Sequence, residues 1–389
     1  MEYFNIIQAL CRSALSNPSS ALIHQVDRLK AALEKDGKTK EAKSLSSLLE
    51  TANSAFDMSP SRIEKSFIKW KGDKITSKTQ IPVDKETSTP LAEIFFVEEL
   101  PVELPIFSDN VRSAIESVVV EWKEYDKLQE LSAHPSNTCL IYGAPGTGKT
   151  HLAKWLAKQI GLPVVLVRLD GLMSSFLGTT SRNIGNLFSF AEKHQCVLLL
   201  DEFDAIAKLR NDPQEVGEIK RVVNTLLQNL DSRKTIGFTI GVTNHETLLD
   251  PAIWRRFEVQ LEIPKPSFEL MPDIIKTFFI PLELEDVEFK FLAWCIENAS
   301  GADAQMLAKW YKRAYFLNKD ESLVSSIRKF SLLNSGRIDQ RKRNLLLHSD
   351  DELKSALLND ERYSFKQKDV ASLFGITQSK LSKQMSKLK

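Results

Sequence analysis

The sequence has few cysteines and no long apolar run. Only four of its 389 residues are cysteine, and no two of them form a CxxC pair. This spacing argues against a disulfide framework or a zinc knuckle. No apolar stretch approaches the ~20 residues that a membrane-spanning helix needs, and the N-terminus lacks the basic segment of a secretory signal. We therefore expect a cytoplasmic protein that does not cross a membrane.

An excess of charge of one sign is also missing. The chain has 52 Lys and Arg against 51 Asp and Glu, a formal net charge of +1 at pH 7. This balance excludes a uniformly basic nucleic-acid binder and an acidic disordered chain, so any electrostatic specialisation must be local. Glycine and proline number 15 each, and 42% of the residues are hydrophobic. Such a composition is typical of a rather helical globular protein with two or three domains.

The apolar pattern divides the chain into five segments. Early apolar residues recur at helical spacing, and later short apolar runs alternate with helical patterns before helices alone continue to the end. The predicted segments are a helical N-terminal domain that binds partners or substrates (1–55), a linker (56–92), an α/β domain (93–264), a small helical domain (265–320) and a helical C-terminal region (321–389).

The α/β segment predicts a parallel sheet. Its strand candidates are residues 139–142, 163–169, 196–200, 238–242 and 259–263. Continuous apolar runs such as CVLLL are typical of strands that are buried on both faces. Strands that alternate with helices indicate a five-stranded parallel sheet sandwiched between helices.

A phosphate-binding loop follows the first of these strands. Residues 143–150 read GAPGTGKT, which matches GxxxxGK[ST] between a predicted strand and a predicted helix. Glycines let backbone N–H groups surround a polyphosphate, the lysine reaches the β and γ phosphates, and the threonine ligates Mg²⁺. The residues predicted to bind nucleotide are Gly143, Ala144, Pro145, Gly146, Thr147, Gly148, Lys149 and Thr150. The alternative is a glycine-rich turn without a ligand.

Two carboxylates directly follow the apolar run of residues 197–200. We expect Asp201 to hold Mg²⁺ together with Thr150, and Glu202 to polarise the water that attacks the γ phosphate of ATP. An acidic strand end is by itself a weak signal. Combined with the phosphate loop, it indicates a nucleotide hydrolysis site.

These motifs together resemble the AAA ATPases, over residues 93–318. The resemblance implies a large ATPase domain over 93–264, a helical lid over 265–320, and ATP with Mg²⁺ as cofactors. In TNHETLLDPAIWRRFE it makes Asn244 the sensor of the attacking water, and Arg255 and Arg256 arginine fingers for a neighbouring subunit. A solvated helix end is the alternative for the arginines. In the lid segment SGAD, Gly301 and Ala302 would approach the adenine.

The same resemblance suggests a loop that grips substrate. Phe176, Leu177 and Gly178 occupy the position of the aromatic-hydrophobic-glycine pore loop of AAA unfoldases. In a hexameric ring, such loops could hold an extended polypeptide in the central channel. Packing of Phe176 at a helix start is the competing interpretation.

The C-terminal tail supports a second hypothesis. Residues 366–389 resemble a helix-turn-helix of the phage-repressor type, and residues 361–389 hold seven basic and two acidic residues, a net of +5. The residues that would face a DNA major groove are Gln378, Ser379, Lys380 and Lys383. Docking of a protein on this helical pair remains the alternative.

These observations predict a ring-forming ATPase, with a hexamer as the expected assembly, that remodels or threads protein substrates. The chain is similar to bacterial AAA ATPases encoded beside subtilisin-like proteases, so a partner protease in a defence or plasmid system is one expectation. A DNA-associated ATPase of replication, partition or transposition, guided by the tail, is the alternative. A nucleotide-binding scaffold without turnover is disfavoured because Lys149, Glu202, Asn244 and both arginines are present.

Overall fold

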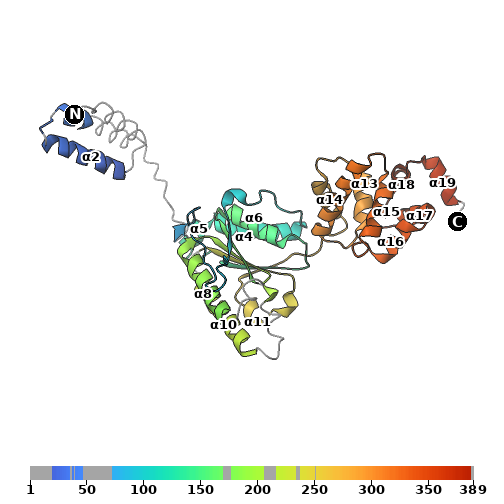
Figure 1. The fold of residues 1–389 in the computed structure, drawn as a ribbon. Helices are drawn as coiled ribbons and strands as arrows, with labels where there is room; N and C mark the ends of the chain where they lie inside the picture. Colours follow the sequence, from blue (N-terminus) through green and yellow to red (C-terminus); the bar gives the residue numbers. More distant parts are fainter. Residues whose placement is uncertain are drawn as a thin grey trace. The chain divides into compact units, whose positions relative to one another are not determined.

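The chain forms two units, Met1–Lys69 and Trp70–Lys389. The computed structural model describes residues 20–35, 37–38, 40–46, 72–169, 177–205, 216–233, 237–249 and 251–386. In the first unit, helix α2 (Ser20–Lys35) buries Val26 and Leu33, and residues 40–46 are helical (Figure 1). The described part of this unit is therefore helical.

A six-stranded sheet forms the centre of the second unit. Its strands lie in the order β2-β4-β6-β7-β3-β8. Their bounds are β2 (Glu93–Phe95), β3 (Thr138–Tyr142), β4 (Val164–Arg168), β6 (Val197–Asp201), β7 (Phe238–Thr243) and β8 (Val259–Glu262). The five predicted strands are present and parallel. The edge strand β2, which runs antiparallel to β4, was not predicted, because three residues carry too little periodicity.

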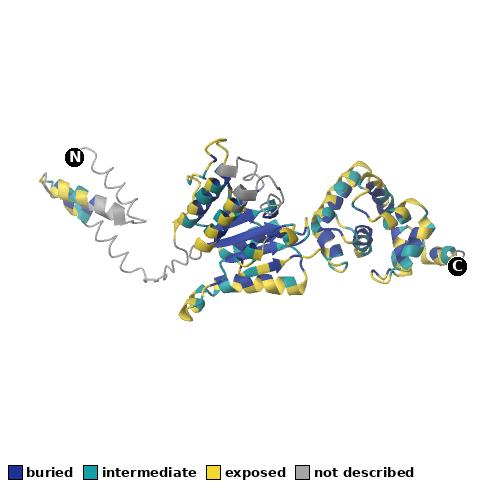
Figure 2. Cartoon of the chain, turned by 90° about the horizontal axis from the view of Figure 1, so that it is seen from below, coloured by how far each residue is buried: buried dark blue, intermediate teal, exposed yellow. Residues whose placement is uncertain are grey.

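Helices cover both faces of this sheet. Helices α4 (Asp109–Lys123) and α6 (Lys149–Ile160) share a core with one face, and α8 (Leu177–Lys193) and α10 (Val216–Ser232) with the other. Cys139 and Ile141 of β3 join the first core and Leu140 joins the second, because neighbouring strand residues point to opposite faces. Figure 2 shows these strands buried at the centre of the domain. The predicted sandwich of helices and a parallel sheet is confirmed.

Part of the predicted linker belongs to the domain. Strand β1 (Asp73–Lys74) pairs with β5 (His194–Gln195), and Ile75 and Leu91 are buried in the core beside α8. The Asp84 side chain is 2% exposed and accepts a hydrogen bond of 2.7 Å from the Asn183 side chain. Residues 72–92, which were predicted to be part of the linker (56–92), therefore pack against the domain. The apolar residues of this stretch are few and widely spaced among polar ones. The sequence therefore shows no helix or strand periodicity that would have predicted the packing.

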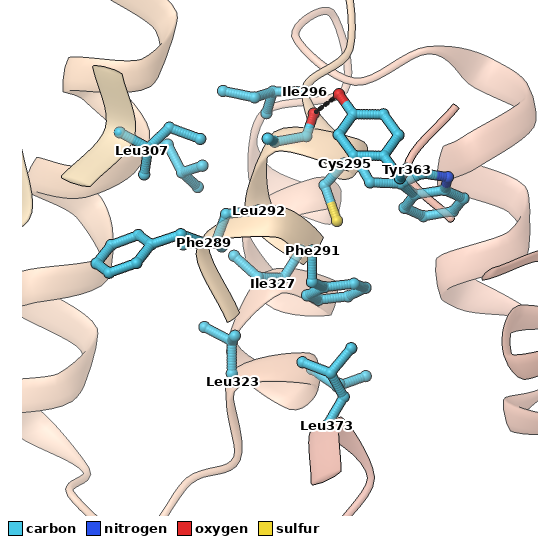
Figure 3. Close-up of a cluster of buried hydrophobic side chains, with 14 of the residues drawn as sticks. Phe289, Phe291, Leu292, Cys295, Ile296, Leu307, Leu323, Ile327, Tyr363 and Leu373 are labelled. Atoms are coloured by element: carbon cyan, nitrogen blue, oxygen red, sulfur yellow. Dashed lines mark hydrogen bonds between the residues drawn. The ribbon is translucent and has the colours of Figure 1, made fainter. Parts of the chain in front are cut away.

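The C-terminal part of the second unit, residues 271–386, is all helical and has one core. Its helices are α12 (Met271–Phe279), α13 (Asp286–Cys295), α14 (Gly301–Leu317), α15 (Leu323–Leu333), α16 (Gln340–Leu347), α17 (Asp350–Leu358), α18 (Gln367–Leu373) and α19 (Gln378–Ser386). Figure 3 shows Phe289 and Phe291 of α13 among side chains from α14, α15 and α18. The hydrophobic core therefore continues across the predicted domain boundary at residue 320. We call residues 334–386 the C-terminal extension.

Short elements complete the second unit. They are η1 (Val97–Glu99), α5 (Tyr125–Glu130), η2 (Glu246–Leu248) and α11 (Pro251–Trp254). Within the described ranges, no helix combines the length and apolar character needed to cross a membrane.

Candidate functional site

The loop between β3 and α6 has the conformation that its glycines allow. Gly143, Gly146 and Gly148 have φ angles of 134°, 76° and 91°, which residues with a Cβ rarely adopt. A Cβ at Gly143 would also lie 2.2 Å from the carbonyl oxygen of Ile263, and one at Gly146 would lie 2.5 Å from Ser300 Oγ. Gly143 thus lets the loop approach the end of β8, and Gly146 lets it approach the start of α14.

Lys149 places a buried cation inside this loop. Its side chain opens α6 and is only 4% exposed, and Nζ donates to the carbonyl oxygens of Gly143 (2.8 Å) and Ala144 (2.6 Å). Burial lowers the pKa of Lys149 to about 8, although the negative charge of Asp201 opposes this shift. A bound anion would favour the charged ammonium, so the loop suits a phosphate group.

Thr150 and Asp201 meet beside the loop. Thr150 Oγ1 donates to Asp201 Oδ2 over 3.0 Å, although 51 positions separate the two residues. The contact arises because β6 ends next to the start of α6. A hydroxyl and a carboxylate are oxygen ligands of the kind that Mg²⁺ takes, and Mg²⁺ is usually held by one or two protein groups plus phosphates and water. These two residues therefore fit a magnesium ion.

Glu202 follows Asp201 in a strained backbone conformation. Its φ is +55°, and its backbone N–H donates to Asp201 Oδ1 over 2.9 Å. The Arg168 guanidinium lies 3.6 Å from Glu202 Oε2. Arg168 ends β4, where the parallel register pairs it with Asp201. A non-glycine residue with positive φ at such a position is common at functional sites.

Asn244 lies just beyond the end of β7, the strand next to β6. It is half-buried. The preceding Thr243 is buried, and its hydroxyl donates to Asp204 Oδ1 over 3.3 Å and accepts from the His245 backbone N–H over 3.1 Å. These bonds fix the backbone on both sides of Asn244 at the carboxyl edge of the sheet, where ligands of open α/β sheets bind.

Arg255 and Arg256 differ in their surroundings. Arg256 donates to the Ala252 carbonyl over 3.2 Å and lies 3.3 Å from Asp231 Oδ2. Arg255 is exposed. Among the described residues, no hydrogen bond or ion pair joins either arginine to residues 143–150 of its own chain. Arg255 is therefore the more exposed of the two residues, and Arg256 is engaged within its own chain.

A cavity of about 510 Å³ opens beside the phosphate loop. One wall is the loop at residues 146–148, and another is the segment 103–108 before α4. The predicted lid supplies Leu270, Ile274 of α12, and Gly301 and Ala302 of α14. Ala302 N–H donates to the Gly146 carbonyl over 3.0 Å. An apolar cavity next to a phosphate loop suits the base of a nucleotide.

The fold and this site define a P-loop nucleotide-binding protein. The loop, the carboxylates of Asp201 and Glu202, and the adjoining cavity lie at the carboxyl ends of the five parallel strands. Residues 139–265 match the model of the ATPase family associated with various cellular activities (AAA). Residues 139–265 are therefore similar to an AAA ATPase domain, and the site within them fits ATP with Mg²⁺.

Several curated proteins are similar to the chain. An uncharacterized AAA family ATPase of Sinorhizobium fredii is 39% identical over 49% of this chain and 59% of its own length. A proteasome-activating nucleotidase of Archaeoglobus fulgidus is 34% identical over 58% of this chain and 59% of its own length. The ATP-dependent zinc metalloprotease FtsH of Aquifex aeolicus is 32% identical over 51% of this chain and 33% of its own length. The chain thus spans little more than half the length of the first two relatives.

Two further sets of residues were predicted. Phe176 falls outside the described residues, and Leu177 and Gly178 begin α8. The four predicted DNA contacts of the tail all lie on α19, and all four are exposed. They are Gln378, Ser379, Lys380 and Lys383.

Sequence reasoning missed Arg168 and the cavity wall at residues 103–108. Arg168 could have been found from strand order, because the ends of neighbouring parallel strands meet at one edge. The segment 103–108 precedes α4 without a motif, and only the tertiary fold brings it against the phosphate loop.

Proposed function

We propose that this protein is an ATP- and Mg²⁺-dependent AAA ATPase that assembles into a hexameric ring in the cytoplasm and remodels or threads protein substrates. The contact between Thr150 and Asp201 is the single observation that carries the hydrolytic part of the proposal. It joins the end of the phosphate loop to the acidic strand end, as a site for a metal-bound polyphosphate requires.

Each residue of the site has a distinct role in this proposal. Backbone N–H groups of residues 143–150 and the Lys149 ammonium bind the phosphates. Thr150 and Asp201 hold Mg²⁺, which neutralises charge on the phosphate oxygens when it is bound. Asn244 orients the attacking water. Glu202 accepts a proton from that water as its oxygen approaches the γ phosphorus, and ADP departs with the bridging oxygen.

The ring follows from the arginines. A guanidinium that neutralises charge on the transferring phosphoryl group contributes strongly to hydrolysis, yet Arg255 is exposed and makes no polar contact with residues 143–150 within the described chain. Arg255 therefore serves the site of a neighbouring subunit. Arg256 supports it from within its own chain, through Asp231 and the Ala252 carbonyl.

The names of two similar proteins support protein as the proposed substrate. One is named a proteasome-activating nucleotidase and another an ATP-dependent zinc metalloprotease. A partner protease that receives the threaded chain is part of the proposal. Phe176, Leu177 and Gly178 form the proposed grip on the substrate, and residues 1–55 form the proposed site for partners or substrates.

Phe176→Ala is expected to abolish the ATP-dependent unfolding of a destabilised fluorescent model protein while most basal ATP hydrolysis persists. The aromatic ring supplies the grip, and it is not part of the hydrolytic site. Loss of fluorescence and release of phosphate are measured in the same reaction. Phe176→Tyr keeps an aromatic ring and is the control, with unfolding preserved. Unchanged unfolding by Phe176→Ala would return Phe176 to a packing role.

A DNA-associated ATPase is the second candidate, and the arrangement of α17, α18 and α19 favours it. Val370, Ala371 and Leu381 are buried, and Gly375 makes the turn with φ +60°. Helix α17 packs against both other helices and completes a three-helix unit that the sequence alone did not indicate. The exposed face of α19 remains available for a major groove.

Truncation after residue 360 tests the DNA candidate. The intact protein is expected to shift a DNA duplex in a gel, with affinity that falls steeply as salt rises, because lysines release counterions from phosphates. Lys380→Ala with Lys383→Ala should weaken binding like the truncation and preserve the helices. Lys312→Ala with Lys319→Ala, two lysines outside the tail, is the charge-matched control. Equal DNA binding by all four proteins would remove this candidate.

A further inference from the structure

The contact between the lid and the phosphate loop depends on Asp303. The backbone N–H and the hydroxyl of Ser300 both donate to Asp303 Oδ2, over 3.0 and 2.7 Å. This capping arrangement starts α14 at Gly301, so that Ala302 N–H reaches the Gly146 carbonyl. A Cβ placed on Gly146 would lie 2.5 Å from Ser300 Oγ and 2.9 Å from Ala302 Cβ, so the start of α14 packs closely on the phosphate loop. The orientation of Asp303 therefore sets how the lid contacts the phosphate loop.

The other oxygen of Asp303 is bound by the C-terminal extension. Arg337, in the turn between α15 and α16, donates from Nη1 to Asp303 Oδ1 in an ion pair. Burial alone would raise the pKa of Asp303, but the Ser300 hydrogen bonds and the Arg337 charge hold it below its usual range. Arg337 is itself fixed by its backbone bond to Asn334 (3.0 Å) and by the neighbouring Ile338, which is 3% exposed in the shared core.

A second group of contacts fastens the rest of the extension to the lid. The Glu297 carboxylate pairs with both Lys342 and Arg362. Lys342 Nζ also donates to the Trp294 carbonyl over 2.7 Å, and Trp294 Nε1 donates to Asp360 Oδ2 over 2.9 Å. The extension is thus attached to α13 at several points, so that Arg337 reaches Asp303 from a firmly held support.

We infer that Arg337 is a positioning residue through which the C-terminal extension sets the affinity of the site for ATP. The chain of contacts runs from Arg337 through Asp303 and Ser300 to Ala302 and the Gly146 carbonyl. Without Arg337, Asp303 keeps its bonds to Ser300 but loses the charge that fixes its outer oxygen. The lid then contacts the loop in more than one orientation, and nucleotide binding weakens. This inference rests on the proposed ATPase function.

The test is the affinity of full-length Arg337→Ala and Arg337→Glu for a fluorescent ATP analogue, together with KM and kcat for ATP. We expect Kd and KM to rise about threefold to fivefold in Arg337→Ala, the range of a partly exposed ion pair, and about tenfold in Arg337→Glu. The kcat at saturating ATP should stay close to that of the wild type, because the lost contact supports binding rather than the reacting atoms. Arg337→Lys should recover most of the affinity.

Arg328→Ala is the matched control. Arg328 forms an ion pair with Asp350 between α15 and α17, and its side chain is 31% exposed against 34% for Arg337. Without nucleotide, Arg328→Ala should lose about as much thermal stability as Arg337→Ala. Its Kd for the ATP analogue should stay at the wild-type value. The double variant Asp303→Asn with Arg337→Ala should lose less ATP-binding free energy than the sum of the losses in the two single variants.

Two outcomes separate this inference from the proposed function. A wild-type chain that neither binds nor hydrolyses ATP overturns the ATPase function and the inference with it. An active wild type whose Arg337→Ala and Arg337→Glu variants bind ATP as tightly as it does overturns the inference alone. The positioning role of Arg337 is also overturned if Arg328→Ala weakens ATP binding as much as Arg337→Ala.

Discussion

Replacing Glu202 with Gln is expected to leave ATP bound and to slow its hydrolysis by about 10²- to 10⁴-fold, the usual contribution of a general base. The amide has nearly the shape of the carboxylate but cannot accept the proton of the attacking water. Lys149, Thr150 and Asp201 remain in place, so binding of a fluorescent ATP analogue should be close to that of the wild type. Phosphate release and equilibrium binding measured on one preparation give both quantities.

Glu116→Gln is the control for this change. Glu116 lies exposed on α4, so the same loss of one negative charge should leave hydrolysis unaltered. Wild-type hydrolysis by Glu202→Gln would contradict the assignment of Glu202 as the base. Loss of ATP binding together with hydrolysis would instead make Glu202 part of the binding site.

Arg255→Ala is expected to lower hydrolysis about 10³-fold, at the lower end of the effect of an arginine finger. In the proposed ring, the affected site is that of the neighbouring subunit. Lys149→Ala should be inactive for a different reason, because it cannot hold the phosphates of its own ATP. A mixture of the two inactive variants should regain hydrolysis, since a Lys149→Ala subunit still offers Arg255 to an intact site on its neighbour. Phosphate release measured against mixing ratio detects this complementation.

Arg256→Ala is the comparison that the structure suggests. Arg256 is engaged by Asp231 and the Ala252 carbonyl of its own chain, so its loss should reduce hydrolysis less than the loss of Arg255. A mixture of Arg255→Ala and Lys149→Ala that stays inactive would refute a finger supplied between subunits. An equal loss in Arg255→Ala and Arg256→Ala would mean that both arginines reach the neighbouring site.

Much of the α/β fold could be predicted because its signals are local. Strand β6 is a continuous apolar run, since both of its faces are buried. The phosphate loop can be recognised in the sequence because its backbone conformation requires glycine at positions 143 and 146. The binding of phosphate in turn requires the cation of Lys149. Strand β2 and residues 72–92 carry no such signal, because their burial depends on what they meet in the folded domain.

The composition and the motifs by themselves predicted the class of protein, the parallel sheet and the residues 143–150, 201 and 202 that are proposed to bind and hydrolyse ATP. Only the tertiary structure decided what surrounds them. It placed Arg168 beside Glu202, the segment 103–108 against the loop, and the extension residue Arg337 on Asp303. A local motif fixes the chemistry of its own residues, whereas partners distant in sequence are chosen by packing, which no single stretch of sequence encodes.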